Sequence, residues 1–124
     1  MMPYERFHAW QACDALVGAV YRLTGGFPRH ELYGLTSQAR RAAFSAAANI
    51  AEGSAKRGVA EFRRYLDIAI GSLSELSYTL RLSLKLGYLV ESDWQELDAL
   101  RGSASRLTWQ LYEAVSRKRR TPSV

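Results

Sequence analysis

The segment from Leu32 to Lys56 reads LYGLTSQARRAAFSAAANIAEGSAK, and its composition decides the fold. On a helical wheel of about 100° per residue, its apolar residues cover two sides of one helix. The core-facing side holds Leu32, Leu35, Ala39, Ala42, Ala43, Ala46, Ile50 and Gly53. The second side, interrupted by Arg40, holds Tyr33, Phe44, Ala47, Ala48 and Ala51. A helix that is apolar nearly all round is expected to be buried nearly all round, so we predict a subunit interface on the second side.

Three further segments show helical periodicity, and no segment is typical of a strand. The first runs from about Glu5 to Thr24 and stops at the Gly25–Pro28 turn. The third runs from about Val59 to Leu86 and is closed by Gly87. The fourth follows Ser92–Gln95, which resembles a capping box. Short connections force antiparallel neighbours, so we predict an all-α, up-down-up-down antiparallel four-helix bundle.

The bundle is expected to be one domain over residues 1–124, with residues 117–124 as a frayed basic tail. We also expect Gly58 to take the left-handed conformation that often ends a helix, here the second one. A chain of 124 residues is long enough to bury a continuous core without disulfides or metals.

Composition limits where this protein works. Hydrophobic residues make up 48% and charged residues 23%, and no apolar run approaches the length of a membrane span. The first residues lack the pattern of a secretory signal, so we expect a cytoplasmic protein without a membrane partner. The single cysteine, Cys13, lies on an apolar helix face and is expected to be inert core packing.

The sequence offers no catalytic or cofactor constellation. The two histidines, His8 and His30, are outside the Glu-x-x-His spacing of di-metal bundles. Gly25-Gly26 lacks the later glycine and lysine of a phosphate-binding loop, and no strand-turn-helix elbow displays a nucleophile. We therefore expect no metal, no cofactor and no enzymatic activity.

Charge is expected to gather at one end of the bundle. The net charge is +5, and up-down topology places the start of the first helix, the second connection and the end of the fourth helix together. The cations expected there are Arg6, Lys56, Arg57, Arg63, Arg64, Arg117, Lys118, Arg119 and Arg120. Repeated around a ring, they would form a collar able to bind RNA or DNA phosphate. The alternative is that they serve solubility and favour helix C-termini, and the chain has none of the usual base-reading motifs.

Polar residues beside the apolar stripes form a second candidate site. The group is Arg41, Ser45, Asn49, Glu52, Ser72 and Glu75. We favour a hydrogen-bonded network that fixes helix register, because buried carboxylates need partners. A ligand or partner site around Asn49, Glu52 and Glu75 is the alternative.

Trp109 departs from the core stripe of the fourth helix by nearly half a turn. We expect it to anchor the oligomer interface. The alternatives are a stacking platform for a base and a ring that lies on its own helix.

The ordered motifs of the chain, over about Phe7 to Tyr112, resemble a known family. They are Phe27-Pro28, Glu31-Leu32-Tyr33-Gly34-Leu35, Gln38 with Arg40-Arg41, Ser45, Asn49-Ile50-Ala51-Glu52-Gly53, Glu61-Phe62, Ile68-Ala69, Gly71-Ser72-Leu73, Glu75-Leu76 and Leu86-Gly87-Tyr88. The family is that of bacterial four-helix-bundle proteins encoded in intervening sequences of 23S rRNA genes. Ala46-Ala47-Ala48 departs from its usual larger or more varied residues, and the C-terminal tail is outside the pattern.

The resemblance implies a four-helix protomer that assembles as a homopentameric barrel. It also implies kinship with the accessory variability protein of diversity-generating retroelements, a basic barrel that binds nucleic acid and a reverse transcriptase. We therefore expect a homo-oligomer that binds RNA or DNA. The alternative is a protein-interaction scaffold without nucleic-acid binding, whose ring recruits a reverse transcriptase or another protein through Trp109 or the acidic end.

Overall fold

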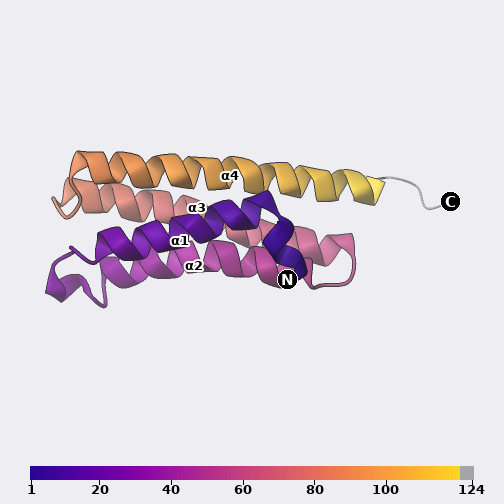
Figure 1. Ribbon diagram of the computed structural model, residues 1–124, viewed down its shortest axis with the longest axis horizontal. Coiled ribbons are helices and arrows are strands. Elements are labelled where there is room, and N and C mark those ends of the chain that lie inside the picture. Colours follow the sequence, from indigo (N-terminus) through magenta and orange to yellow (C-terminus); the bar gives the residue numbers. More distant parts are fainter. Residues whose placement is uncertain (121–124) are drawn as a thin grey trace.

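Four antiparallel helices form this protein. The computed structural model describes residues 1–120, and the side chains as far as Lys118. The helices are α1 (His8–Thr24), α2 (Leu35–Ser54), α3 (Val59–Lys85) and α4 (Glu91–Arg120), and two short 3-10 turns, η1 (Pro3–Arg6) and η2 (Arg29–Glu31), precede α1 and α2. The four helices lie side by side along one axis (Figure 1). The predicted all-α, up-down-up-down bundle is confirmed.

The core lies between the four helices. Each helix packs against its neighbours in sequence, and α4 closes the bundle against α1. Leucine side chains of α1, α3 and α4 are fully buried at Leu16, Leu66, Leu73, Leu76 and Leu97. The buried side chains of α2 are smaller: Thr36, Ala39, Ala42, Ala43, Ala46, Ala47, Ile50 and Gly53. Small side chains let α2 lie close to both neighbours, since little volume separates the backbones.

The closest approach is at Gly53, where α2 meets the first turns of α3. A Cβ atom at this position would lie 2.7 Å from the Cβ of Tyr65 and 3.1 Å from Cδ1 of Phe62. Both distances are below ordinary van der Waals contact, so only glycine fits without a shift of α3. The Asn49–Gly53 segment therefore ends in a glycine for a packing reason.

Glu31 caps the N-terminus of α2 and ties it to the α3–α4 turn. Its Oε1 accepts a hydrogen bond from the Leu35 N–H at 3.1 Å, and its Oε2 accepts one from the Tyr88 hydroxyl at 2.9 Å. A Cβ at Gly34 would collide with this carboxylate. The Leu35 hydrogen bond, and next the Tyr88 hydrogen bond, hold the pKa of Glu31 below its ordinary value of 4.5. The same contact raises the pKa of Tyr88.

Several predicted helix ends are wrong, for local reasons. The first helix is interrupted at Phe7, whose backbone is extended (φ −76°, ψ 125°) between η1 and α1. The second starts only after Gly34, so Leu32 lies outside it and is 45% exposed rather than in the core. Ser92 is not an N-cap, since α4 already begins at Glu91.

Two glycines have positive φ, with different roles. Gly87 (φ 81°) ends α3 in a Schellman motif, in which the N–H of Tyr88 donates to Ser83 O and that of Gly87 to Leu84 O. Gly58 (φ 85°, ψ 149°) is not in the left-handed helical conformation expected, and it precedes α3 instead of ending α2. Of the tail expected to fray from residue 117, the first four residues continue α4 to Arg120, and residues 121–124 lie outside the described part.

Cys13 is fully buried, as expected for core packing. Burial raises the pKa of its thiol to about 11, against a smaller opposing effect of the hydrogen bond with Thr108. The thiol therefore stays protonated at neutral pH, which makes it a poor nucleophile.

We predict that Gly53→Ala is less stable than Gly18→Ala by about 1–3 kcal/mol, the usual cost of overpacking. Both changes gain the same helix propensity, but a Cβ at Gly18, in α1, meets nothing within 4 Å. Urea unfolding of the two variants measures the difference. Equal free energies of unfolding for the two variants would show that α3 shifts to accommodate the new Cβ without loss of stability.

The Glu31 cap should make stability depend on pH. Because the pKa of Glu31 is lowered on folding, its stabilisation is complete above pH 4.5 and is lost as the pH falls through the folded-state value. The free energy of unfolding should be higher for the wild type than for Glu31→Gln at neutral pH. The gap should shrink below pH 4.5, and a gap that does not change with pH contradicts the assignment.

Candidate nucleic-acid interface

The three chain segments that carry the predicted cations lie at one end of the bundle. This end, the basic pole, comprises the N-terminal segment, the α2–α3 connection and the last turns of α4 (Figure 1). The opposite pole comprises the α1–α2 and α3–α4 connections. The juxtaposition follows from the antiparallel order of the four helices. With 30 residues, α4 is the longest, and its end projects beyond the others (Figure 1).

The exposed cations at the basic pole come from three segments. Arg6 lies in η1, Arg57 in the α2–α3 connection, and Arg117 and Lys118 near the end of α4. Arg6, Arg57 and Lys118 make no ion pair with any described residue. Arg119 and Arg120 continue α4, but their side chains are outside the described part.

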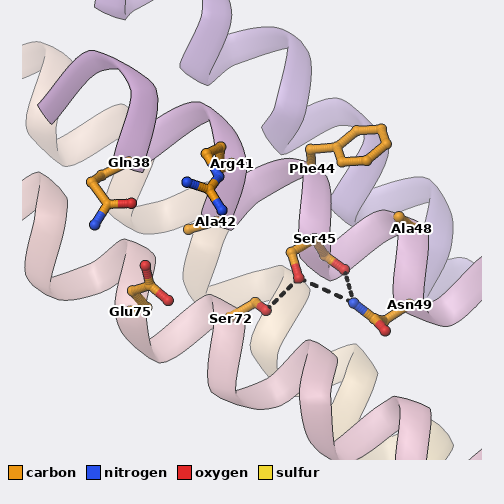
Figure 2. Close-up of a pocket in the computed structure, with 9 residues that line it drawn as sticks. All are labelled: Gln38, Arg41, Ala42, Phe44, Ser45, Ala48, Asn49, Ser72 and Glu75. Carbon is orange, nitrogen blue, oxygen red and sulfur yellow. Dashed lines mark hydrogen bonds between the residues drawn. The ribbon is translucent and has the colours of Figure 1, made fainter. Parts of the chain in front are cut away.

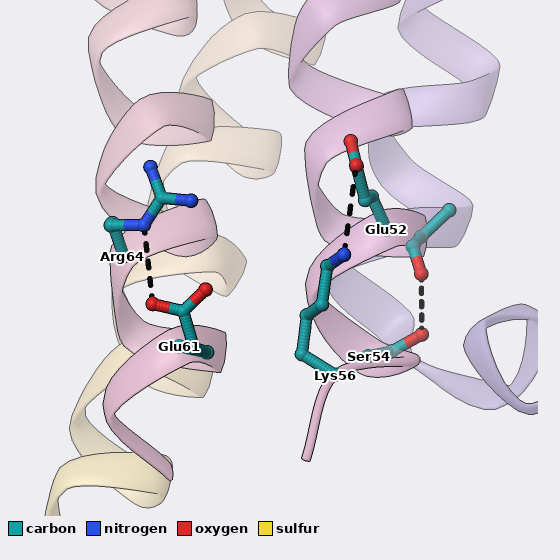
Figure 3. Close-up of polar contacts among 6 residues, drawn as sticks. Glu52, Ser54, Lys56, Glu61 and Arg64 are labelled. Atoms are coloured by element: carbon teal, nitrogen blue, oxygen red, sulfur yellow. Dashed lines mark hydrogen bonds and ion pairs between the residues drawn. The ribbon is translucent and has the colours of Figure 1, made fainter. Parts of the chain in front are cut away.

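Lys56 and Arg64 flank one aromatic ring, that of Tyr65. Lys56 Nζ lies 5.4 Å from the ring centroid, and the guanidinium carbon of Arg64 lies 4.7 Å from it. Each cation also has a carboxylate partner, Glu52 at 4.0 Å and Glu61 at 3.4 Å (Figure 3). Such exposed pairs contribute little to stability, so both cations are free to turn toward another anion.

Arg63 is not on the open surface where we predicted it. The side chain is half-buried between α3 and α4, and its Nη2 donates a 2.8 Å hydrogen bond to the Tyr112 hydroxyl. Its guanidinium carbon lies 5.1 Å from the centroid of the Tyr112 ring, and its Nε is buried with no described partner. Arg63 therefore joins two helices. No sequence pattern indicates this contact, because the partners are 49 residues apart.

Half of the predicted polar network exists. Ser45 Oγ and Ser72 Oγ lie 2.8 Å apart across α2 and α3, and Asn49 Nδ2 donates to Ser45 O at 2.8 Å and to Ser45 Oγ at 3.0 Å (Figure 2). Ser72 Oγ also donates to Ile68 O. The Ser45–Ser72 bond joins α2 to α3, and the other bonds lie within one helix and orient the two hydroxyls. This is the structural role we favoured.

The charged members of that group do not join it. Arg41 and Glu75 are both exposed and line the same pocket of about 370 Å³, but no hydrogen bond or ion pair connects them (Figure 2). Glu52 faces Lys56 instead. The ion pair expected between Arg41 and Glu75 is therefore absent, and both charged side chains are exposed to solvent.

The second apolar side of α2 is open only in part. Phe44 is 60% exposed, and Ala48 and Ala51 are partly exposed. Tyr33 is 93% exposed but lies in the turn before α2, so its assignment to this helix face is wrong. Ala47 is buried within the protomer at 7% exposure, so its assignment to the free face is wrong. Arg40 covers one edge, since its guanidinium lies over the Tyr21 ring and donates to Thr24. A narrower apolar strip thus remains unpartnered in the single chain.

Trp109 is 48% exposed, and its ring meets that of Tyr112 edge-on at 5.5 Å between centroids. It thus extends the Arg63–Tyr112 contact along α4. About half of its surface is free for a partner.

Within the described residues, no group of three His, Cys, Asp or Glu side chains is placed to hold a metal ion. No helix among them has both the length and the apolarity needed to cross a bilayer.

Comparison with known proteins identifies a family. The profile of the 23S rRNA-intervening sequence protein family matches residues 5–110, which include all of α1, α2 and α3 and most of α4. No curated protein matches the chain. The matched region contains the Glu31 cap, the Ser45–Asn49–Ser72 network and Gly53. The chain therefore belongs to the 23S rRNA-intervening sequence protein family, as its motifs indicated.

Proposed function

We propose that this protein is a non-enzymatic, oligomeric helical bundle that binds the phosphate backbone of RNA or DNA through its basic pole. The observation that carries the proposal is the convergence of exposed cations from three chain segments at one end. They are Arg6, Lys56, Arg57, Arg64, Arg117 and Lys118.

The chemistry of this end suits phosphate. Lysine and arginine displace counterions from a phosphate backbone, and this contribution does not depend on base sequence. At the opposite pole the charges are mixed, and Arg22 there pairs with Glu96 at 2.6 Å. The electrostatic potential is therefore expected to attract polyanions to one end only.

Oligomerisation would multiply these contacts. The apolar strip of α2 around Phe44 lies on the side of the bundle, so copies joined there would keep their basic poles free. Several poles on one strand would raise the affinity through effective concentration. We propose this strip as the contact between copies.

A protein-interaction scaffold is the second candidate. The half-exposed Trp109 favours it, because tryptophan is enriched among the residues that dominate protein interfaces. The two candidates differ in their response to salt.

We expect mixed-sequence RNA to bind at low salt and to be released steeply as salt rises. Replacing Arg6, Arg57 and Lys118 together by Gln should weaken binding and flatten the slope of log affinity against log salt by about 2–3, because each phosphate contact contributes about 0.7–0.9. Fluorescence anisotropy across a salt series measures both quantities.

The matched control replaces Arg22, Arg29 and Lys85 by Gln, which removes the same charge at the opposite pole. Its affinity should stay close to that of the wild type. Equal losses in the two triple variants would mean that net charge alone matters. Failure of the wild type to bind at low salt leaves the scaffold as the function.

Phe44→Asp should convert the oligomer to monomers, because the change places a charge against apolar surface. Tyr78→Asp is the control, since Tyr78 is an exposed aromatic residue of α3 (68% exposed) outside the predicted interface. Sedimentation velocity gives the masses. An unchanged mass for Phe44→Asp, or a monomeric wild type at micromolar concentration, contradicts the assignment of this strip.

A further inference from the structure

Two pockets lie side by side at the basic pole and share Phe7 and Leu111. The larger, the Phe62 pocket, has a volume of about 400 Å³. It is lined by Phe7, Lys56, Gly58, Val59, Phe62, Leu111, Ala114, Val115 and Lys118. The smaller, the His8 pocket, has a volume of about 330 Å³ and lies on the other side of Phe7. Its further lining residues are Arg6, His8, Ala9, Leu107 and Gln110.

The position of Phe7 creates this arrangement. Its extended backbone interrupts the helical path between η1 and α1, and its ring packs toward α3. The ring centroids of Phe7 and Phe62 are 5.9 Å apart with planes inclined by 57°. Both side chains are only half-buried, so aromatic surface remains accessible at the pole.

Cations border both pockets. Lys56 and Lys118 line the Phe62 pocket, and Arg6 lines the His8 pocket. None of the described lining residues is acidic. Each pocket thus combines an apolar floor with positive charge at its rim, a combination that is absent from the polar pocket around Arg41 and Glu75.

We infer that the two pockets take up unstacked bases, and hence that this protein prefers single-stranded to duplex nucleic acid. The inference rests on the function proposed above and adds the strand class. A nucleotide offers a flat aromatic base beside a phosphate, which matches an apolar pocket with a cationic rim. Bases of a duplex are stacked in pairs and do not reach such a pocket. With one base on each side, Phe7 would separate two neighbouring bases of the strand.

The cations favour a polyanion over a single small anion. Arg57 and Arg117 add exposed positive charge at the same pole, so a ligand with repeated phosphates gains more contacts than one carboxylate or phosphate would. The apolar floors then add a contribution that does not fade with salt, since burial of a base is not screened.

The first experiment measures the binding of three probes of equal length to the full-length protein. The probes are oligoadenylate, the same ribose-phosphate backbone without bases, and the RNA duplex of oligoadenylate with its complementary strand. We expect oligoadenylate to bind about tenfold or more tightly than the abasic strand, in the range of base stacking on aromatic side chains. The duplex should also bind more weakly than oligoadenylate at moderate salt. Equal affinity for oligoadenylate and the abasic strand overturns the inference without requiring any variant.

The second experiment fills the larger pocket. Ala114→Phe adds a ring to the floor of the Phe62 pocket and removes no cation, whereas Ala60→Phe adds the same ring to an exposed site of α3 that lines neither pocket. Ala114→Phe should bind oligoadenylate about tenfold more weakly and the abasic strand as before. Ala60→Phe should resemble the wild type, and thermal unfolding confirms that both variants fold.

The possible failures are distinguishable. If oligoadenylate binding is unchanged in Ala114→Phe but lost in the Arg6, Arg57 and Lys118 triple variant, the base pockets are refuted and phosphate binding stands. If Ala114→Phe alters the oligomer mass, the pocket belongs to a contact between copies and the inference fails. If no probe binds at low salt, the proposed function fails, and this inference with it.

Discussion

The close packing of α2 on α3 at Gly53 is the constraint on which the basic pole depends. There is no room for a side chain at Gly53, because Phe62 and Tyr65 pack directly against its backbone. The α2 backbone therefore restricts the positions of these two aromatic side chains. Phe62 then lines the larger pocket, and Tyr65 lies between Lys56 and Arg64. The lack of a side chain at Gly53 thus helps to position both the Phe62 pocket and part of the positive charge at the basic pole.

Aromatic rings position several of the cations at the basic pole. Lys56 and Arg64 lie against Tyr65, and Arg63 lies over Tyr112. A tyrosine ring attracts a cation through its quadrupole without neutralising it, whereas a carboxylate cancels the charge. Where carboxylates are also present, as with Glu52 and Glu61, the pairs are exposed and weak. Positive charge therefore remains available at this end while the side chains are partly ordered.

The surfaces assigned to self-association and to nucleic acid are spatially separate. The apolar strip with Phe44 lies on α2. The three chain segments that carry the cations meet at one end of the bundle (Figure 1). The Ser45–Ser72 hydrogen bond next to this strip joins α2 to α3. A rigid strip and a remote basic pole allow assembly and phosphate contact to occur together in the proposed oligomer.

The sequence by itself determined the helical bundle, its antiparallel order and the end at which the cations gather. Apolar periodicity and short connections leave few other solutions, and the order of the helices then places Arg6, Arg57 and Lys118 together. It also indicated the family through motifs such as Asn49–Gly53. These features depend on the spacing of residues along the chain, which the sequence shows directly.

Only the tertiary structure decided which individual side chains are free. Ala47 lies on the wheel side that was expected to be open, yet it is buried, because α2 is covered over a wider arc than a single stripe. Arg63 bonds to Tyr112 across helices, and Phe7 leaves the helical path to form the wall of two pockets. Such contacts join residues far apart in the chain at distances of a few ångströms, and no periodicity within one segment specifies them.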